Sequence, residues 1–235
     1  MSDLAIRPSL ERLEEYVVET IDADIVVNAN ESNYPLPEAV RSEIEAETGK
    51  VAFNRYPPMR GDSLRVLIAD ALGIDPDKVR VGNGSSELLQ MACYAFGGIG
   101  RRIAVPYPSF SMYSVYARLS DSDVLQYPLT VDGFLDAEAL IAFCRAKRPH
   151  LLIINNPNNP TGNYNPLSVI EKIISQVDCP IIVDEAYIDF GGKSAMELVN
   201  KYENVLVVQT FSKSRAMAGM RIGYCFGNPE LIKAL

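Results

Sequence analysis

The amino-acid sequence predicts an α/β fold with a mostly parallel β-sheet flanked by helices. Short runs of Val, Ile and Leu alternate along the 235 residues with longer segments of helical character, an alternation that is typical of parallel sheets. The runs contain few polar residues, as expected of strands that are covered on both faces. Strands are expected at residues 79–81, 102–105, 124–126, 151–154, 181–183, 205–208 and 222–226. Helices are expected at residues 40–47, 63–72, 86–96, 136–146, 166–176 and 229–235.

The composition argues against several classes of function. A net charge of −8 argues against a nucleic-acid-binding surface, which needs a basic face. No apolar run is long enough to span a bilayer, and the N-terminal segment does not resemble a signal peptide. The four cysteines form no Cys-x-x-Cys pair and His150 is the one histidine, so neither a metal site nor a Ser-His-Asp triad is expected. Free thiols are typical of a reducing cytoplasm, where we expect the protein to reside.

Polar motifs follow five of the predicted strands. They lie at residues 82–86, 106–110, 155–162, 184–187 and 210–213. The carboxyl ends of parallel strands lie along one edge of a sheet, and ligands bind at that edge. We therefore expect the five motifs to share one site.

A lysine among hydroxyl groups follows the strand at residues 205–208. Residues 210–213 read Thr-Phe-Ser-Lys, and Arg221 lies eight positions after Lys213. The lysine amine can form a Schiff base with an aldehyde, and the hydroxyls and the guanidinium can hold a phosphate dianion. A cofactor that carries both groups is pyridoxal phosphate. The simpler interpretation is a solvated surface lysine, but the neighbouring motifs favour the cofactor.

Residues 82–86, Gly-Asn-Gly-Ser-Ser, form a predicted strand–turn–helix junction with small residues at the turn. The backbone amides at the start of the helix, with a hydroxyl from Ser85 or Ser86, would make a cradle for a phosphate. Taken alone, a capped turn without a ligand explains the motif more simply.

Three further residues could hold the ring of the cofactor. Asp184, at a strand end, would lie beneath the pyridine nitrogen and keep it protonated, and Tyr187 could donate a hydrogen bond to the phenolic oxygen. An amide of Asn159, in a loop fixed by prolines and a glycine, could contact the same oxygen from the other side. Taken singly, Asp184 could instead cap the next turn, and the loop could be a plain rigid turn.

Two aromatic residues are further candidates. Phe110 offers a flat face that could stack on a pyridine ring, although a lone aromatic residue after a strand usually packs in the core. Tyr56, which is followed by two prolines, could point its hydroxyl towards a phosphate or across a subunit boundary, or it could lie in a surface turn.

Together these motifs resemble the fold-type-I pyridoxal-phosphate-dependent aminotransferases, and most closely the histidinol-phosphate aminotransferase family. Asn-Pro-Thr-Gly at residues 159–162, the aspartate of Asp-Glu-Ala-Tyr at residues 184–187 and the lysine of residues 210–213 are shared across many aminotransferases. Three motifs narrow the resemblance to the histidinol-phosphate branch and its close relatives: Asn-Ala-Asn-Glu at residues 28–31, Arg-Tyr-Pro at residues 55–57, and Asp-Glu-Ala-Tyr. The motifs run in family order over nearly the whole chain.

The resemblance implies a reaction: transfer of an amino group from L-histidinol phosphate to 2-oxoglutarate, giving imidazole acetol phosphate and glutamate, in histidine biosynthesis. Lys213 would bind the cofactor covalently and then move the proton between Cα and C4′ of the cofactor. The implied cofactor contacts are Asp184 at the pyridine nitrogen, Tyr187 and Asn159 at the ring oxygen, Phe110 on the ring, and Gly84, Ser85, Ser86, Thr210, Ser212 and Arg221 at the phosphate. Tyr34 would face the substrate side chain. Tyr56 would reach the phosphate of the neighbouring subunit, which implies a homodimer.

The resemblance also divides the chain into two parts. Residues 1–50 would form an N-terminal arm and part of a small domain, and residues 51–235 the cofactor-binding large domain. Family members continue beyond the position of Leu235, so the small domain is expected to be largely absent and its arginine for the substrate carboxylate has no counterpart here. Two alternatives stay open. One is a related enzyme with the same cofactor, another aminotransferase or a phospho-amino-acid decarboxylase; the other is a catalytically silent fragment that binds the cofactor.

Overall fold

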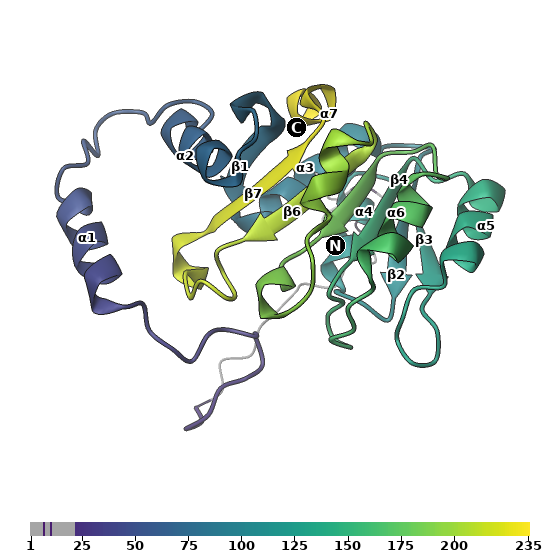
Figure 1. Ribbon diagram of the computed structural model, residues 1–235, viewed down its shortest axis with the longest axis horizontal. Coiled ribbons are helices and arrows are strands. Elements are labelled where there is room, and N and C mark those ends of the chain that lie inside the picture. Colours follow the sequence, from purple (N-terminus) through teal and green to yellow (C-terminus); the bar gives the residue numbers. More distant parts are fainter. Residues whose placement is uncertain (1–6, 8–9, 11–21) are drawn as a thin grey trace, which may run out of the picture.

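A seven-stranded mixed sheet forms the centre of the molecule (Figure 1). The computed structural model describes residues 7, 10 and 22–235. In spatial order the strands are β1 (Val79–Asn83), β7 (Ile222–Gly227), β6 (Val205–Thr210), β5 (Ile181–Asp184), β4 (Leu151–Asn155), β2 (Arg102–Tyr107) and β3 (Asp123–Pro128). All seven predicted strands are confirmed, and each is slightly longer than the sequence predicts.

One strand, β7, runs against the others. The strands β2 to β6 pair in parallel, whereas β7 pairs antiparallel with both β6 and β1. Because β1 is antiparallel to β7, it has the same direction as the five parallel strands. The sheet is therefore mostly parallel, as predicted. The amino end of β7 lies at the same edge as the carboxyl ends of the other six strands.

Helices cover both faces of the sheet, so the domain has three layers. One face is covered by α3 (Gly84–Phe96), α4 (Met112–Leu119) and α7 (Pro229–Ala234). The other face is covered by α2 (Asp62–Leu72), α5 (Ala137–Lys147), α6 (Leu167–Ile174) and the 3₁₀ helix η3 (Ala195–Asn200). Successive strand residues such as Ile153 and Ile154 are both fully buried, one in each core cluster. Burial on both faces explains why the strands are almost continuously apolar.

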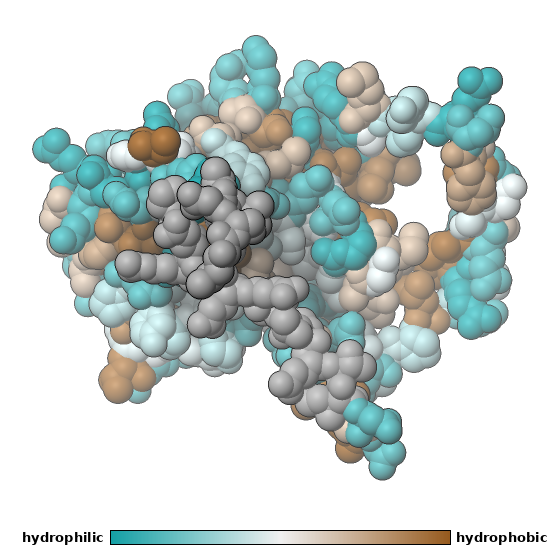
Figure 2. Space-filling model, turned by 180° about the vertical axis from the view of Figure 1, so that it is seen from behind, coloured by the Kyte–Doolittle hydropathy of each residue, from teal (hydrophilic) through white to brown (hydrophobic). Residues whose placement is uncertain are grey.

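Much of the N-terminal part of the described chain stands apart from this body, although residues 28–31 contact it. The helix α1 (Glu38–Thr48) has no buried residue, and the chain on either side of it loops away from the sheet (Figure 1). Seen from behind, an opening separates this arm from the body (Figure 2). Apolar side chains are exposed along it, with Val27 at 78% and Phe53 at 81%. The predicted arm, residues 1–50, is described only at residues 7, 10 and 22–50.

The start of α3 differs from the prediction, which placed it at residue 86. Gly84 adopts a left-handed conformation (φ +72°) and donates its backbone N–H to the carbonyl of Arg221 at 2.8 Å. The carboxylate of Glu87 accepts the backbone N–H of Asn83 at 2.6 Å, which completes the helix start.

The helix α4 is missing from the sequence prediction. No helix in the described part of the chain combines the length and apolar character that a membrane span requires.

Candidate active site

A cavity of about 690 Å³ opens at the edge of the sheet where the carboxyl ends of the strands and the amino end of β7 meet. Residues of all five predicted motifs lie at this edge, together with the arm segment 28–31. Ten of the thirteen predicted residues line the cavity: Ser85, Ser86, Phe110, Asn159, Asp184, Tyr187, Thr210, Ser212, Lys213 and Arg221. The site therefore brings together side chains that are far apart in the sequence.

Two of the predicted residues lie away from the cavity. Tyr34 is 75% exposed and Tyr56 is fully exposed, and neither lines the cavity wall. The isolated chain does not bring these tyrosines to the other site residues. Their expected contacts, with the substrate and with the neighbouring subunit, stay predictions.

Hydroxyl groups and a guanidinium gather at one end of the cavity. The Thr210 hydroxyl donates to Ser212 Oγ at 3.0 Å, and it accepts the backbone N–H of Ser212 at 3.1 Å. Arg221 Nη1 donates to Ser212 Oγ at 3.4 Å. Arg221 reaches this end because it directly precedes β7, the strand that begins at the site edge. Such donors suit an anion with several oxygen atoms.

The backbone approaches the same end closely, and two glycines permit this. A Cβ atom on Gly84 would overlap the guanidinium of Arg221, and a Cβ atom on Gly223 would overlap the backbone of Gly84 and Ser85. The first turn of α3 therefore packs directly against β7, and Ser85 and Ser86 of this turn line the cavity. Gly84, the remaining predicted residue, shapes this cradle from behind the cavity wall.

A buried carboxylate lies elsewhere in the cavity wall. Asp184 is 3% exposed, and its Oδ2 accepts a hydrogen bond from the Tyr113 hydroxyl at 2.7 Å, while its Oδ1 accepts the Ala186 backbone N–H at 3.1 Å. Burial raises the pKa of Asp184 from 3.8 to about 6, and these two donors oppose the rise. Among the described residues Asp184 forms no ion pair. The carboxylate thus has hydrogen bonds but lacks a cation, which a ligand could supply.

The lysine amine lies between the arm and the β5 loop. Lys213 Nζ donates to the carbonyl of Ala29 at 2.8 Å and lies 5.8 Å from the centroid of the Tyr187 ring. The Tyr187 hydroxyl accepts a hydrogen bond from the Asn30 amide at 3.0 Å. Burial lowers the pKa of Lys213, and the nearby Arg221 lowers it further, while Glu31 acts in the opposite direction. A lowered pKa increases the share of neutral, nucleophilic amine.

Sequence reasoning missed several residues that shape the site. Asn155 accepts the backbone N–H of Asn159 at 2.7 Å and donates to the carbonyl of Asp184 at 3.2 Å, so it joins two of the loops. Tyr113 packs edge-on against Phe110, with ring centroids 5.5 Å apart. Asn155 stands in a motif that the sequence analysis singled out, whereas Tyr113 lies on the unpredicted helix α4.

Among the residues that the structure describes, no three His, Cys, Asp or Glu side chains could together hold a metal ion.

Replacing Tyr113 with phenylalanine is expected to raise the pKa of Asp184 above its value of about 6. The change removes the hydroxyl that donates to the charged carboxylate, and such a bond corresponds to roughly one pKa unit or more. A ¹³C-NMR titration of the Asp184 carboxyl measures the shift. Tyr127→Phe is the matched control, because Tyr127 is equally buried but its hydroxyl donates to the carbonyl of Ile153. An equal response to both changes would contradict the link between Tyr113 and Asp184.

Comparisons with known proteins point to one family. The chain matches the model of the family "aminotransferase class I and II" over residues 24–235. It is 42% identical over 211 residues to the histidinol-phosphate aminotransferase of Thermococcus gammatolerans. The aligned region covers 90% of this chain and 61% of that protein. A mutant aspartate aminotransferase from Thermus thermophilus has a similar structure, with a TM-score of 0.77, 28% identity and coverage of 88% of this chain and 60% of that one.

A second solved structure supports the fold alone. The histidinol-phosphate aminotransferase from Sinorhizobium meliloti, in complex with pyridoxal-5′-phosphate, superimposes with a TM-score of 0.82 at 24% identity. The match covers 88% of this chain and 56% of that chain. The present chain therefore spans less than two thirds of the length of each of these three proteins.

Proposed function

Because the chain belongs to the aminotransferase class I and II family, we propose that it binds pyridoxal phosphate and transfers an amino group from L-histidinol phosphate to 2-oxoglutarate in histidine biosynthesis. The observation that carries the proposal is one cavity lined by a lysine amine, a buried carboxylate without a cation and a cluster of anion-binding groups. The amine suits the aldehyde of pyridoxal phosphate, the carboxylate suits its pyridine nitrogen, and the anion-binding groups suit its phosphate.

The cradle at the start of α3 fits the phosphate of the cofactor. The hydroxyls of Ser85, Ser86, Thr210 and Ser212 and the guanidinium of Arg221 line one part of the cavity. Gly84 and Gly223 let Arg221 and β7 pack closely against the start of α3, whose backbone amides would bind the phosphate. In this proposal these residues bind the phosphate and so orient the rest of the cofactor.

The buried carboxylate fits the pyridine nitrogen. When bound, pyridoxal phosphate supplies an electron sink, which is stronger when its ring nitrogen is protonated. We assign to Asp184 the task of holding that proton, with Tyr113 fixing the carboxylate. The pyridinium would be the cation that Asp184 lacks. Phe110 would stack on the ring, and Tyr187 and Asn159 would donate to its oxygen; all three line the cavity.

The amine of Lys213 is assigned two roles. It would bind the aldehyde carbon, and after the substrate amine has displaced it, its Nζ would move a proton from the substrate Cα to C4′ of the cofactor. The lowered pKa of Lys213 supports both roles, since a neutral amine is both a nucleophile and a base.

The proposed enzyme is larger than the site described above. We propose that residues 51–235 form the cofactor-binding large domain, and that residues 1–50 form the N-terminal arm and part of a small domain. Two copies would form a homodimer in the cytoplasm, with Tyr56 reaching the phosphate of the neighbouring site and Tyr34 facing the substrate. The full exposure of Tyr56 is compatible with a contact to another subunit.

The visible spectrum of the purified chain with pyridoxal phosphate tests the proposal. We expect a band of the lysine-bound cofactor that shifts when L-histidinol phosphate is added and returns when 2-oxoglutarate follows. L-Aspartate added in place of L-histidinol phosphate is the control for the amino donor. If the spectrum shifts with L-aspartate but not with L-histidinol phosphate, the proposed amino donor is wrong. If the cofactor binds but its spectrum changes with neither amine, the chain is a cofactor-binding fragment without activity. A chain that leaves the spectrum of free pyridoxal phosphate unchanged would overturn the proposal.

A further inference from the structure

A chain of polar contacts begins at Glu185, the residue next to Asp184. The two carboxylates point to opposite faces of the sheet, because Asp184 contacts Tyr113 of α4 and Glu185 contacts the start of η3. Glu185 is 1% exposed, and its carboxylate accepts hydrogen bonds from the Ser194 hydroxyl and the Ala195 backbone N–H, each at 2.6 Å. It also accepts the side-chain amide of Gln209 at 2.8 Å.

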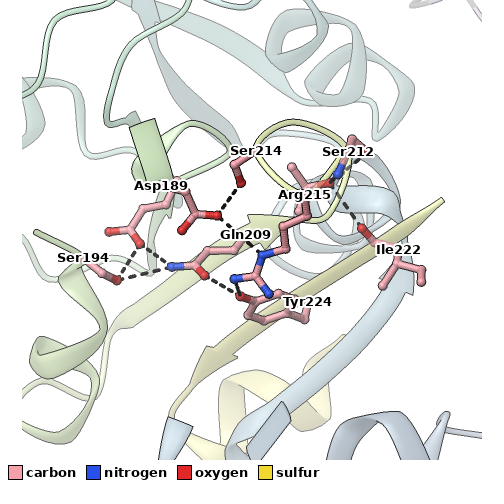
Figure 3. Close-up of polar contacts among 10 residues, drawn as sticks. Asp189, Ser194, Gln209, Ser212, Ser214, Arg215, Ile222 and Tyr224 are labelled. Carbon is pink, nitrogen blue, oxygen red and sulfur yellow. Dashed lines mark hydrogen bonds and ion pairs between the residues drawn. The ribbon is translucent and has the colours of Figure 1, made fainter. Parts of the chain in front are cut away.

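The contacts continue across β6 and β7 to an arginine. The Gln209 carbonyl accepts the Tyr224 hydroxyl at 2.6 Å, and Tyr224 in turn accepts a hydrogen bond from Arg215 Nη2 at 3.3 Å. The guanidinium of Arg215 also lies 4.6 Å from the ring centroid of Phe211 and 5.9 Å from that of Tyr224. Figure 3 shows Arg215 reaching towards Tyr224, with Gln209 beyond it.

An ion pair closes the contacts into a ring. Arg215 Nε lies 3.5 Å from Asp189 Oδ2, and the same oxygen accepts the hydroxyl of Ser214. Asp189 stands four residues after Glu185, on the 3₁₀ helix η2 (Ile188–Phe190). The ring therefore runs from Glu185 through Gln209, Tyr224 and Arg215 to Asp189, and the backbone returns it to Glu185. Figure 3 labels the part of the ring from Gln209 to Asp189.

The ring joins the two segments that carry the amine and the phenol of the site. Asp189 follows Tyr187 by two residues, and Arg215 follows Lys213 by two residues. The ion pair therefore fixes the loop of Lys213 against the loop of Tyr187 just outside the cavity. Both Arg215 and Asp189 have side chains that are 41% exposed, and a pair as exposed as this contributes little to stability. Its placement points to a different role.

We propose that Arg215 is a positioning residue for Lys213. By pairing with Asp189 and stacking on Phe211 and Tyr224, it holds the lysine amine at a fixed place relative to the Tyr187 hydroxyl. The inference rests on the proposed function, since that place is where the aldehyde of pyridoxal phosphate would meet the amine. Arg215 itself does not line the cavity, so it acts through the backbone of residues 213–215.

Reductive trapping of the cofactor tests this role without relying on turnover. The chain is incubated with pyridoxal phosphate, borohydride reduces the lysine–cofactor bond to a stable amine, and mass spectrometry measures the label on each lysine. We expect Lys213 to carry most of the label in the unmodified chain. In Arg215→Met the ratio of label on Lys213 to label on the other lysines should fall about tenfold or more, since small displacements of reacting groups cost large factors in rate. Arg215→Lys, which keeps the charge, should retain part of the selectivity.

The control removes a comparable cation elsewhere. Lys172 is 44% exposed and pairs with Glu138 at 2.6 Å, so Lys172→Met should leave the labelling of Lys213 unchanged, with a similar thermal midpoint to Arg215→Met. Unchanged selectivity in Arg215→Met would overturn the positioning role. If that variant does not fold, Asp189→Asn breaks the same pair with little change of shape, and retained selectivity there overturns the role equally. If the unmodified chain does not label Lys213 preferentially, the proposed function itself fails, which is a separate result.

Discussion

Replacing Lys213 with alanine is expected to lower amino-group transfer by about 10⁴-fold or more, the largest loss that any substitution in the site should cause. The change removes both the nucleophile and the base that moves the proton, and each of these contributes several orders of magnitude. It removes one hydrogen bond to the carbonyl of Ala29 and leaves the core untouched, so the fold should persist. The rate of product formation and the mass of the borohydride-treated chain measure the two effects.

The control for this prediction is a lysine outside the site. Lys193 has a side chain that is 66% exposed and pairs with Glu197, so Lys193→Ala should keep full activity and full labelling of Lys213. A Lys213→Ala chain that still forms a yellow, reducible complex with the cofactor would contradict the assignment of Lys213.

Asp184→Asn is expected to change activity and stability in opposite directions. Asparagine has nearly the same shape, but it carries no charge to hold a proton on the pyridine nitrogen. We expect the rate of amino-group transfer to fall by roughly 10²-fold or more, the loss that follows the removal of one well-placed electrostatic group. Steady-state turnover with L-histidinol phosphate measures this loss.

The same substitution should stabilise the chain in the absence of the cofactor. The folded chain raises the pKa of Asp184 from 3.8 to about 6 by burial, so it favours the protonated form. The stability that protonation provides is fully present below about pH 4 and is lost as the pH rises through about 6. Two pKa units correspond to about 3 kcal/mol. At pH 8 the free energy of unfolding of Asp184→Asn should exceed that of the unmodified chain by an amount of this order.

Urea unfolding of both chains between pH 4 and pH 8, without pyridoxal phosphate, checks this expectation. Burial also raises the pKa of Glu185, to about 7, and the charge of Asp184 is a smaller cause of that rise. The substitution therefore also lowers the pKa of Glu185, but the difference between the two chains reports chiefly on Asp184. Equal stability across this range would contradict the view that the cavity holds a carboxylate awaiting a cation. A variant that is both less active and less stable would indicate a structural role for Asp184.

The strands could be predicted almost completely from the sequence, for a physical reason. A strand that is buried on both faces is apolar at nearly every position, so a short apolar run such as residues 151–154 indicates such a strand. The helix α4 could not be predicted in the same way. Its sequence, Met-Tyr-Ser-Val-Tyr-Ala-Arg-Leu, contains aromatic and β-branched residues with modest helix propensity. Packing on the sheet decides its conformation, and local preference does not.

Site residues at strand ends could be predicted from the sequence, whereas residues that act through tertiary contacts could not. Lys213, Asp184 and Arg221 each lie at or near the end of a strand, so the topology of the sheet alone brings them to one edge. Tyr113 and Arg215 act through contacts with residues far away or across the sheet, and no pattern in the sequence reveals these contacts. The exposed Tyr34 and Tyr56 do not line the cavity of the described chain, so their roles stay predictions.

The reversed strand β7 also determines when β1 can be paired during synthesis. Within the part of the chain that the structure describes, β1 pairs with no strand other than β7, as in the pairing of Val79 with Phe226, although the two strands are far apart in the sequence. On the ribosome, β1 and the glycine-rich turn after it must wait for this partner until β7 emerges. Such distant pairing makes folding slow and leaves strand edges open meanwhile. The cradle of backbone amides and hydroxyls at the start of α3 can thus form only after β7 has emerged, and a chain arrested before β7 should lack it entirely.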